Sequence, residues 1–282
     1  LIRTVGALAV APGELTRALL DGRRRRYFGP SHVALATLAL FVMQDGLVRA
    51  SVPGGVEALV GLVLLVIALR RLLPAGALGF ARGLPTSVMM RGLIAATYFS
   101  AEVFVPLALV QIRGVSVTYA GMVLAGSAAM WSLGSWTQSR IPGDRDRSTV
   151  VRGGLTLVIL SVVTLPMSMD SSVPPWIAGI SWGIGAFGMG LAIPSVAVQV
   201  MRLSPDQDQG RNSAAIQIVD AVCVSLVVSL LSLGYAASIT GAGVTARTFT
   251  LLWLASAAVG LVGFVVAGRM RPTPLPSSAS CL

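Results

Sequence analysis

Glu102 is the acidic residue of this sequence whose position most strongly suggests chemistry. It lies in an apolar run from Val88 to Ile112, 11 residues after Arg91, which is about 16 Å along a helix that rises about 1.5 Å per residue. An ionisable side chain at the centre of a membrane costs about 2.5 to 3.5 kcal/mol to insert, so it is by default a functional candidate. We interpret Glu102 as a proton-coupling acid or as a binding partner for a cationic substrate. The alternative is a carboxyl group that only hydrogen-bonds to a neighbouring helix.

Tyr98 is predicted to share a helix face with Glu102. Arg91, Tyr98 and Glu102 are spaced by seven and four residues, so they fall within about 40° of one another at 3.6 residues per turn. We therefore expect one polar face on an otherwise apolar helix.

Asp220 is the second acidic candidate. Ser213, Gln217 and Asp220 are offset by four and three residues and form one stripe on a helix, with Asp220 about two turns inside the membrane end. Asp220 and Gln217 are predicted to contact substrate or protons. The alternative is a gate or an interhelical contact near the interface.

Two other ionisable residues are given structural roles. Asp45 precedes Arg49 by four residues near the end of an apolar run, so we expect an interfacial salt bridge. His32, the only histidine, precedes the same run beside Pro30, and its location favours an interfacial position over a proton relay.

The segment Gly183–Gly188 matches the spacing GxGxxG of dinucleotide-binding loops. That motif requires a strand before it and a helix after it in a soluble unit, whereas this segment lies inside an apolar run. With Gly179 and Gly190 it forms small-residue spacings that let helices approach closely. We predict helix packing here, with a bend near Pro194.

The sequence lacks the common catalytic and metal-binding motifs. No serine–histidine–aspartate set, HExxH motif or P-loop occurs, and Cys223 and Cys281 show no metal-ligand spacing. We expect no enzymatic activity, no cofactor and no metal. An ion gradient is then a simpler energy source than ATP.

The composition of the chain requires a membrane as its solvent. Of 282 residues, 55% are hydrophobic and only 11% are charged, and the mean hydropathy is +0.81. Few aromatic residues and 31 glycines favour closely packed helices over a barrel. The net charge of +10 does not indicate a nucleic-acid partner, because the arginines lie between apolar runs. We predict an all-α integral membrane protein, a polytopic helix bundle.

Eight runs are long enough to cross about 30 Å of hydrocarbon. Of the 21 arginines, 18 fall on alternate segments assigned to one side, which places both termini in the cytoplasm and the protein in the cell membrane as a multi-pass bundle. The opposite loops hold Arg49, Arg113 and Arg247. The predicted spans are 32–48, 57–73, 88–112, 118–137, 150–169, 175–201, 213–236 and 249–268.

Three passages between Pro85 and Gly268 resemble the C-terminal six-helix half of the major facilitator superfamily, in particular bacterial drug:proton antiporters. The first runs from Arg91 to Leu107 and resembles the seventh helix of that family. The second, 121–145, resembles its Gly-rich and Arg-rich loop between helices eight and nine, and the third, 210–220, resembles the start of helix eleven. The resemblance implies a partial major facilitator fold.

The resemblance also implies a cytoplasmic gating loop whose ion pairs hold the inward gate closed in one state. Its residues would be Gly134, Arg140, Asp144 and Arg145. The alternative is a loop of alternating charge that simply faces the cytoplasm, and the degenerate motif slightly favours this second interpretation.

The predicted organisation follows from the spans and the resemblance. Helices one to four of the family are absent and the chain starts at Leu1 without Met, so we expect a fragment whose substrate site would require the missing N-terminal half. The expected segments are a cytoplasmic Arg-rich region 1–31, two transmembrane helices 32–73, a central loop 74–87, the six-helix half 88–269 and a disordered tail 270–282.

The implied function is secondary active transport, with protons, a small drug-like, cationic or amphipathic substrate and the lipid bilayer as partners. Proton-coupled efflux is the first expectation. A proton-coupled uptake symporter of the same superfamily and a truncated membrane subunit that transports nothing are the alternatives.

Overall fold

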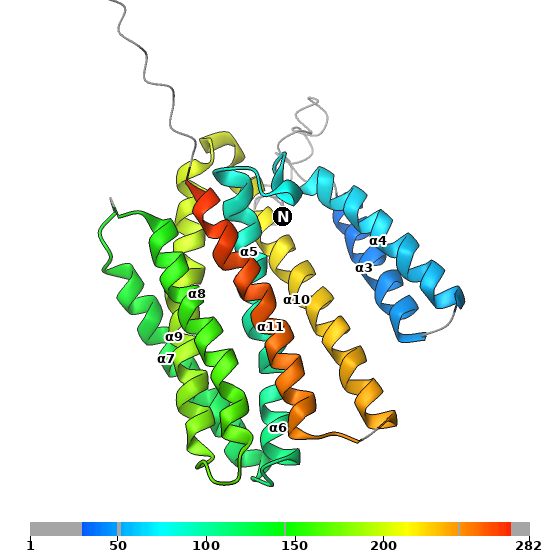
Figure 1. Cartoon of the computed structure of the whole chain (residues 1–282). Helices are drawn as coiled ribbons and strands as arrows, with labels where there is room; N and C mark the ends of the chain where they lie inside the picture. Colours follow the sequence, from blue (N-terminus) through cyan, green and yellow to red (C-terminus); the bar gives the residue numbers. More distant parts are fainter. Residues whose placement is uncertain (1–29, 50–51, 144, 242, 272–282) are drawn as a thin grey trace, which may run out of the picture.

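The structure is a computed structural model that describes residues 30–49, 52–143, 145–241 and 243–271. These residues contain no β-strand and are almost entirely helical (Figure 1). The chain is an all-α polytopic membrane bundle, as its composition predicted. Its α-helices are α3 (Pro30–Arg49), α4 (Val52–Leu72), α5 (Leu84–Glu102), α6 (Phe104–Gln111), α7 (Val117–Ser139), α8 (Arg147–Thr164), α9 (Trp176–Leu203), α10 (Gln209–Thr240) and α11 (Ala246–Val266), and its short 3₁₀ turns are η2 (Ala77–Gly79), η3 (Leu165–Met169), η4 (Asp206–Asp208) and η5 (Ala267–Met270).

Each of the eight predicted spans coincides with a helix or with the kinked pair α5 and α6. Six described segments are both long and apolar enough to cross a membrane, and α4 and α7 are not among these six. Three helices begin four or five residues before the predicted spans: α4 at Val52, α10 at Gln209 and α5 at Leu84, the last inside the predicted central loop. Most of the Arg-rich segment 1–31 and the tail beyond Arg271 lie outside the described residues.

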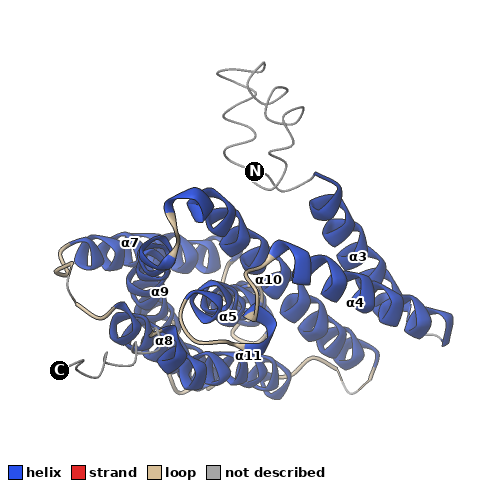
Figure 2. Ribbon diagram, turned by 90° about the horizontal axis from the view of Figure 1, so that it is seen from above, coloured by secondary structure: helices blue, strands red, loops and turns tan. Residues whose placement is uncertain are grey.

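Helix α5 lies at the centre of the bundle. Viewed from above, α8, α9, α10 and α11 surround it, and α7 packs on the outer side of α9 (Figure 2). The α3–α4 hairpin packs against this bundle through α10. Gln44 Nε2 donates a hydrogen bond to Ser229 Oγ at 2.9 Å and so joins the hairpin to α10.

The junction between α5 and α6 is a proline kink. Pro106 has no N–H, so it cannot donate to the carbonyl of Glu102 four residues earlier, and its ring disfavours a continuous helix. The helix is interrupted at Val103, whose N–H reaches the carbonyl of Phe99 at a long 3.4 Å. The kink places Glu102 at a break in the membrane-spanning helix.

Glycines allow α9 to pack closely on both of its neighbours. A Cβ added at Gly188 would lie 2.9 Å from Leu157 Cβ of α8, and one at Gly190 would lie 2.7 Å from the backbone nitrogen of Ser135 in α7. Real Cβ atoms do not approach other atoms this closely, so only glycine fits at these positions. The packing interpretation is therefore confirmed for Gly188 and Gly190, but not for Gly179 and Gly183, where an added Cβ would lie 3.7 and 3.3 Å from the nearest side chain.

We expect Gly154→Leu to destabilise the bundle by about 2 to 3 kcal/mol, because it inserts a side chain into a filled interface. A Cβ at Gly154 would lie 2.6 Å from the carbonyl oxygen of Gly188 and 2.9 Å from Ala192 Cβ. The free energy of unfolding in mixed detergent micelles measures this effect. Gly153→Leu is the matched control, because a Cβ at Gly153 meets nothing within 4 Å. Equal losses for the two variants would contradict the packing assignment.

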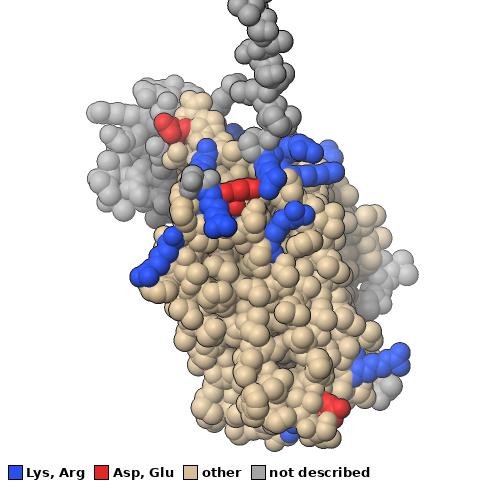
Figure 3. Space-filling model, turned by 60° about the vertical axis from the view of Figure 1, so that its left-hand side comes forward, with Lys and Arg blue, Asp and Glu red and all other residues tan. Residues whose placement is uncertain are grey.

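Arginines gather at one end of the bundle, here called the arginine-rich end. Figure 3 shows basic side chains concentrated at one end of the displayed face, above a long uncharged middle. The opposite end carries only three described arginines, Arg49, Arg113 and Arg247. The arginine-rich end is formed by the loops and helix ends that carry Arg70, Arg71, Arg82, Arg91, Arg140, Arg145, Arg147, Arg152, Arg202, Arg211, Arg269 and Arg271.

Candidate functional site

Glu102 lies within the span Leu84–Gln111 and is partly buried. It is 18 residues, or about 27 Å, beyond Leu84 and 9 residues, or about 13 Å, before Gln111. The sequence placed it near the midplane. Along the helical segment Leu84–Gln111, however, it lies about 7 Å beyond the middle, towards the end opposite the arginines, because α5 begins seven residues before Arg91.

The indole of Trp182 in α9 lies close to the Glu102 carboxyl. Its Nε1–H is close enough to interact with that carboxyl electrostatically. The Nε1–H of Trp182 makes no hydrogen bond of ordinary geometry, and this nitrogen is inaccessible to solvent. No described residue forms an ion pair with Glu102. The carboxyl therefore lies in the membrane span without a compensating positive charge among the described residues.

An aromatic cluster of Tyr98, Phe99, Trp131 and Trp182 lies next to Glu102. The rings of Tyr98 and Trp182 stack with centroids 4.3 Å apart, and both side chains are buried. The ring centroid of Trp131 in α7 lies 6.0 Å from the ring centroids of both Tyr98 and Phe99. The side chains of Trp131 and Phe99 are partly exposed. A carboxyl group beside aromatic rings is chemically suited to an organic cation, because ring faces attract positive charge.

Sequence reasoning missed the three members of this cluster other than Tyr98. One feature of the sequence could have identified two of them: Trp131 and Trp182 lie inside their spans, whereas tryptophans of membrane proteins are enriched at the interfaces. What brings them together is the packing of α5 and α7 on α9, which spacing along one helix does not reveal.

The structure separates Arg91 and Asp220 from Glu102. Arg91 Nη2 and Nε lie 2.7 and 2.8 Å from Asp220 Oδ2, and each side chain is 17% exposed. The expected polar face of α5 is thus divided, with Arg91 bonded to α10 and Tyr98 stacked on α9. Asp220 therefore makes an interhelical contact, which was the alternative to a role in substrate or proton binding.

The stripe predicted on α10 is divided too. Ser213 Oγ donates to the sulfur of Met201 at 3.6 Å, and Gln217 is exposed at a groove of about 370 Å³ between α3 and α10. Apart from Thr37 and Gln217, the lining of this groove is apolar. Gln217 and Asp220 therefore point to different neighbours.

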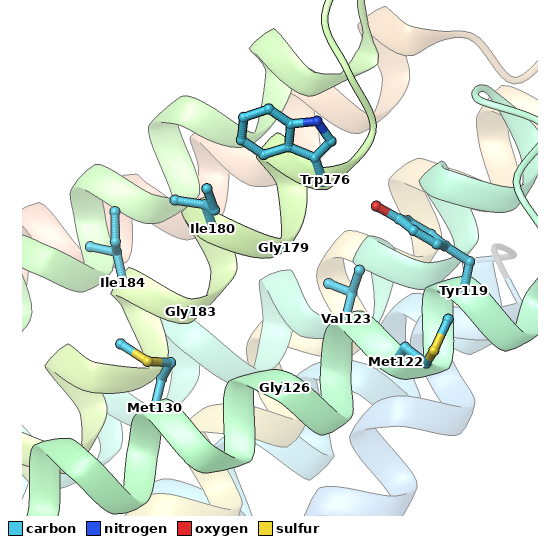
Figure 4. Close-up of a pocket in the computed structure, with 10 residues that line it drawn as sticks. All are labelled: Tyr119, Met122, Val123, Gly126, Met130, Trp176, Gly179, Ile180, Gly183 and Ile184. Atoms are coloured by element: carbon cyan, nitrogen blue, oxygen red, sulfur yellow. The ribbon is translucent and has the colours of Figure 1, made fainter.

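A second groove, of about 500 Å³, opens between α7 and α9. Figure 4 shows Trp176, Ile180 and Ile184 on α9 and Tyr119 and Met130 on α7 bordering this space. Three glycines, at 126, 179 and 183, keep it open. Glu102 and Tyr98 do not line it, although Trp182 lies on the same segment of α9.

The predicted gating-loop residues have separate surroundings. Gly134 is buried against the backbone of α9, the Arg140 guanidinium lies 3.7 Å from the ring centroid of Trp136, and Arg145 is exposed. Asp144 lies outside the described residues.

Asp146, which sequence reasoning did not single out, forms the ion pair of this region. It accepts hydrogen bonds from Ser148 N and Oγ, both at 2.9 Å, as the N-cap of α8. Arg271 Nη2 lies 2.6 Å from Asp146 Oδ2 and joins the end of the described chain to α8. An aspartate directly before an apolar span is an N-cap signal that was available in the sequence.

We expect Asp146→Ala to lower the melting temperature at neutral pH by about 2 to 4 °C, the usual effect of losing an N-cap. Burial raises the pKa of Asp146, but the Ser148 hydrogen bonds and the Arg271 charge outweigh it, so the net pKa is lowered. The stabilisation is then present above the unfolded value of about 4 and is lost as the pH falls through the lower folded value. Melting curves of wild type and variant should converge in acid. Asp208→Ala is the control, because no described residue donates a side-chain hydrogen bond to Asp208; an equal loss there would contradict the assignment.

Asp45 and Arg49 form the salt bridge that their spacing predicted. The atoms Asp45 Oδ2 and Arg49 Nη2 are 2.7 Å apart, and Arg49 also lies 3.4 Å from Glu57 of α4. All three side chains are more than a third exposed, so this network ties the hairpin together near its turn and is not a buried site.

Comparison with known proteins gives one partial match. A family model described as a protein of unknown function (DUF3667) matches residues 1–42, which include the first part of α3. No curated protein matches the chain. The matched residues do not include Glu102, the aromatic cluster or any of α5 to α11.

Proposed function

We propose that this chain is part of a proton-coupled secondary transporter that exports small cationic or amphipathic molecules, with Glu102 as the acid that carries the proton. The observation that carries the proposal is a carboxyl group at a helix break inside a membrane span, without an ion-pair partner among the described residues. Intramembrane acids of this kind occur at substrate and proton pathways, because their insertion cost is otherwise uncompensated.

The surroundings of Glu102 support the choice of substrate. Trp131 and Phe99 are partly exposed and lie side by side, and aromatic rings attract organic cations. A broken helix at the site is common in transporters, where irregular backbone lines the substrate pathway. The resemblance of 85–268 to the C-terminal half of major facilitator transporters favours export coupled to proton entry, and it places Arg140 and Arg145 in a gating loop.

The test is efflux of a fluorescent lipophilic cation from cells that express the complete gene. We expect efflux that stops when a proton uncoupler is added. Dye accumulation driven by the proton gradient would replace export with uptake. Efflux equal to that of cells lacking the gene would remove the transport assignment and favour a structural membrane subunit.

A further inference from the structure

Arg152 of α8 is a charged residue with neither an ion pair nor a hydrogen bond from its side chain to any described residue. Its guanidinium lies 5.0 Å from the ring centroid of Phe264 on α11. Its Nε is buried without a hydrogen-bond partner. The residue as a whole is only partly buried. The seam between α8 and α11 thus presents a positive charge whose terminal nitrogens have no protein acceptor.

Arg147, at the start of α8, is a second arginine with unpaired nitrogens near the same end of the helix. Arg147 is 6% exposed, and its Nε and Nη1 have no hydrogen-bond partner, while its Nη2 donates to the Ile141 carbonyl at 3.3 Å. The nearby carboxylate, Asp146, is already bonded to Arg271 at 2.6 Å. Among the described residues around the start of α8, Arg147, Arg152 and Arg271 therefore outnumber the single carboxylate of Asp146, which gives this end of the helix a positive balance.

Arg152 lies close to the arginine-rich end of the membrane-spanning helix α8. It is five residues, or about 8 Å, from the start of α8 at the arginine-rich end. An arginine at this depth extends towards the headgroups and bonds to phosphate if no protein partner is present. Next to it, Gly153 leaves open space, since a Cβ there meets nothing within 4 Å.

Apolar side chains continue from this position towards the membrane centre. Leu160 and Val163 on α8 and Leu261 and Val265 on α11 are exposed, with exposed fractions between 43% and 74%. An acyl chain could contact these side chains while its phosphate reached Arg152. A soluble anion would use the charge alone and leave this surface uncovered.

We propose that the α8–α11 seam binds the headgroup phosphate of an anionic phospholipid, with Arg152 as the direct ligand and the charge of Arg147 increasing the attraction. The Phe264 ring, 5.0 Å from the guanidinium carbon, restrains the position of Arg152. The assignment concerns a lipid site on the outer surface and does not depend on the transport proposal. Basic positions between transmembrane helices are a known type of anionic-lipid site, and a basic residue in direct contact with the headgroup contributes about fivefold in binding.

The test measures lipid retention by the purified full-length protein in native mass spectrometry, with phosphatidylglycerol and phosphatidylcholine as probes. We expect wild type to retain phosphatidylglycerol preferentially and Arg152→Gln to bind it about fivefold more weakly. Arg145→Gln, which removes an exposed charge from the same end, is the matched control and should bind as wild type does. Arg152→Lys keeps the charge without the planar group and should fall between the two.

Three outcomes would overturn the assignment. Equal phosphatidylglycerol binding by wild type and Arg152→Gln would remove Arg152 as the ligand, and equal binding of the two lipids would remove the charge requirement. Displacement of the lipid by millimolar inorganic phosphate would show a site for a free anion. Gel filtration and helical circular dichroism check that Arg152→Gln is folded, and Arg152→Lys provides the comparison if it is not.

Discussion

Glu102→Gln is expected to abolish uncoupler-sensitive export while the protein still reaches the membrane. The amide has nearly the size of the carboxyl but cannot take up or release a proton, so the packing beside Trp182 is kept and proton exchange is lost. We expect at least a tenfold loss of gradient-driven efflux of a fluorescent cation, about 1.4 kcal/mol or more in the driven step. Substrate exchange without a proton gradient should persist, because it requires no net proton movement.

Asp45→Asn provides the control for Glu102→Gln. It also removes an acid from a predicted span, but Asp45 is paired with Arg49 near a helix end. Export by this variant should match wild type. Glu102→Asp, which keeps a shorter acid, should retain part of the activity. Equal export by wild type and Glu102→Gln would reduce Glu102 to a packing residue and withdraw its proton role.

Arg91→Gln is expected to destabilise the bundle by about 3 kcal/mol. The substitution leaves the Asp220 carboxylate mostly buried between α5 and α10 without its partner, and breaking a buried pair on one side usually costs about 3 to 5 kcal/mol. The lower figure applies because each side chain is 17% exposed. The free energy of unfolding in mixed micelles measures the loss.

The double variant Arg91→Gln with Asp220→Asn distinguishes pairing from two separate contributions. It leaves no unpaired charge, so we expect it to be more stable than Arg91→Gln alone, with a coupling energy above about 1 kcal/mol. Arg49→Gln is the control at an exposed pair and should cost less than about 1 kcal/mol. Additive losses in the double variant would show that Arg91 and Asp220 do not act as a pair.

The gating-loop prediction shows how a short motif can identify a region and miss its contacts. The Arg-rich passage after α7 does lie at the arginine-rich end, and the ion pair there joins Asp146 to Arg271, 125 residues apart. The four predicted residues instead include a packing glycine and an arginine stacked on its own helix. The resemblance pointed to this loop. Which of its residues forms an ion pair depends on a contact with a segment far away in the sequence.

The sequence alone determined the fold class of this protein, the approximate positions of its helices and the concentration of its arginines in alternate connecting segments. Each of these depends on a local balance, because every apolar run must partition into lipid by itself and every arginine avoids the hydrocarbon independently of its neighbours. Spacing within one turn also sufficed for the Asp45–Arg49 salt bridge. Tertiary structure decided the partners of the candidate residues: Arg91 bonds to Asp220, 129 positions away, while Tyr98 stacks on Trp182 beside Glu102. Helical periodicity gives the face of a side chain but not the helix that packs against it, and here α9 and α10 approach different sides of α5.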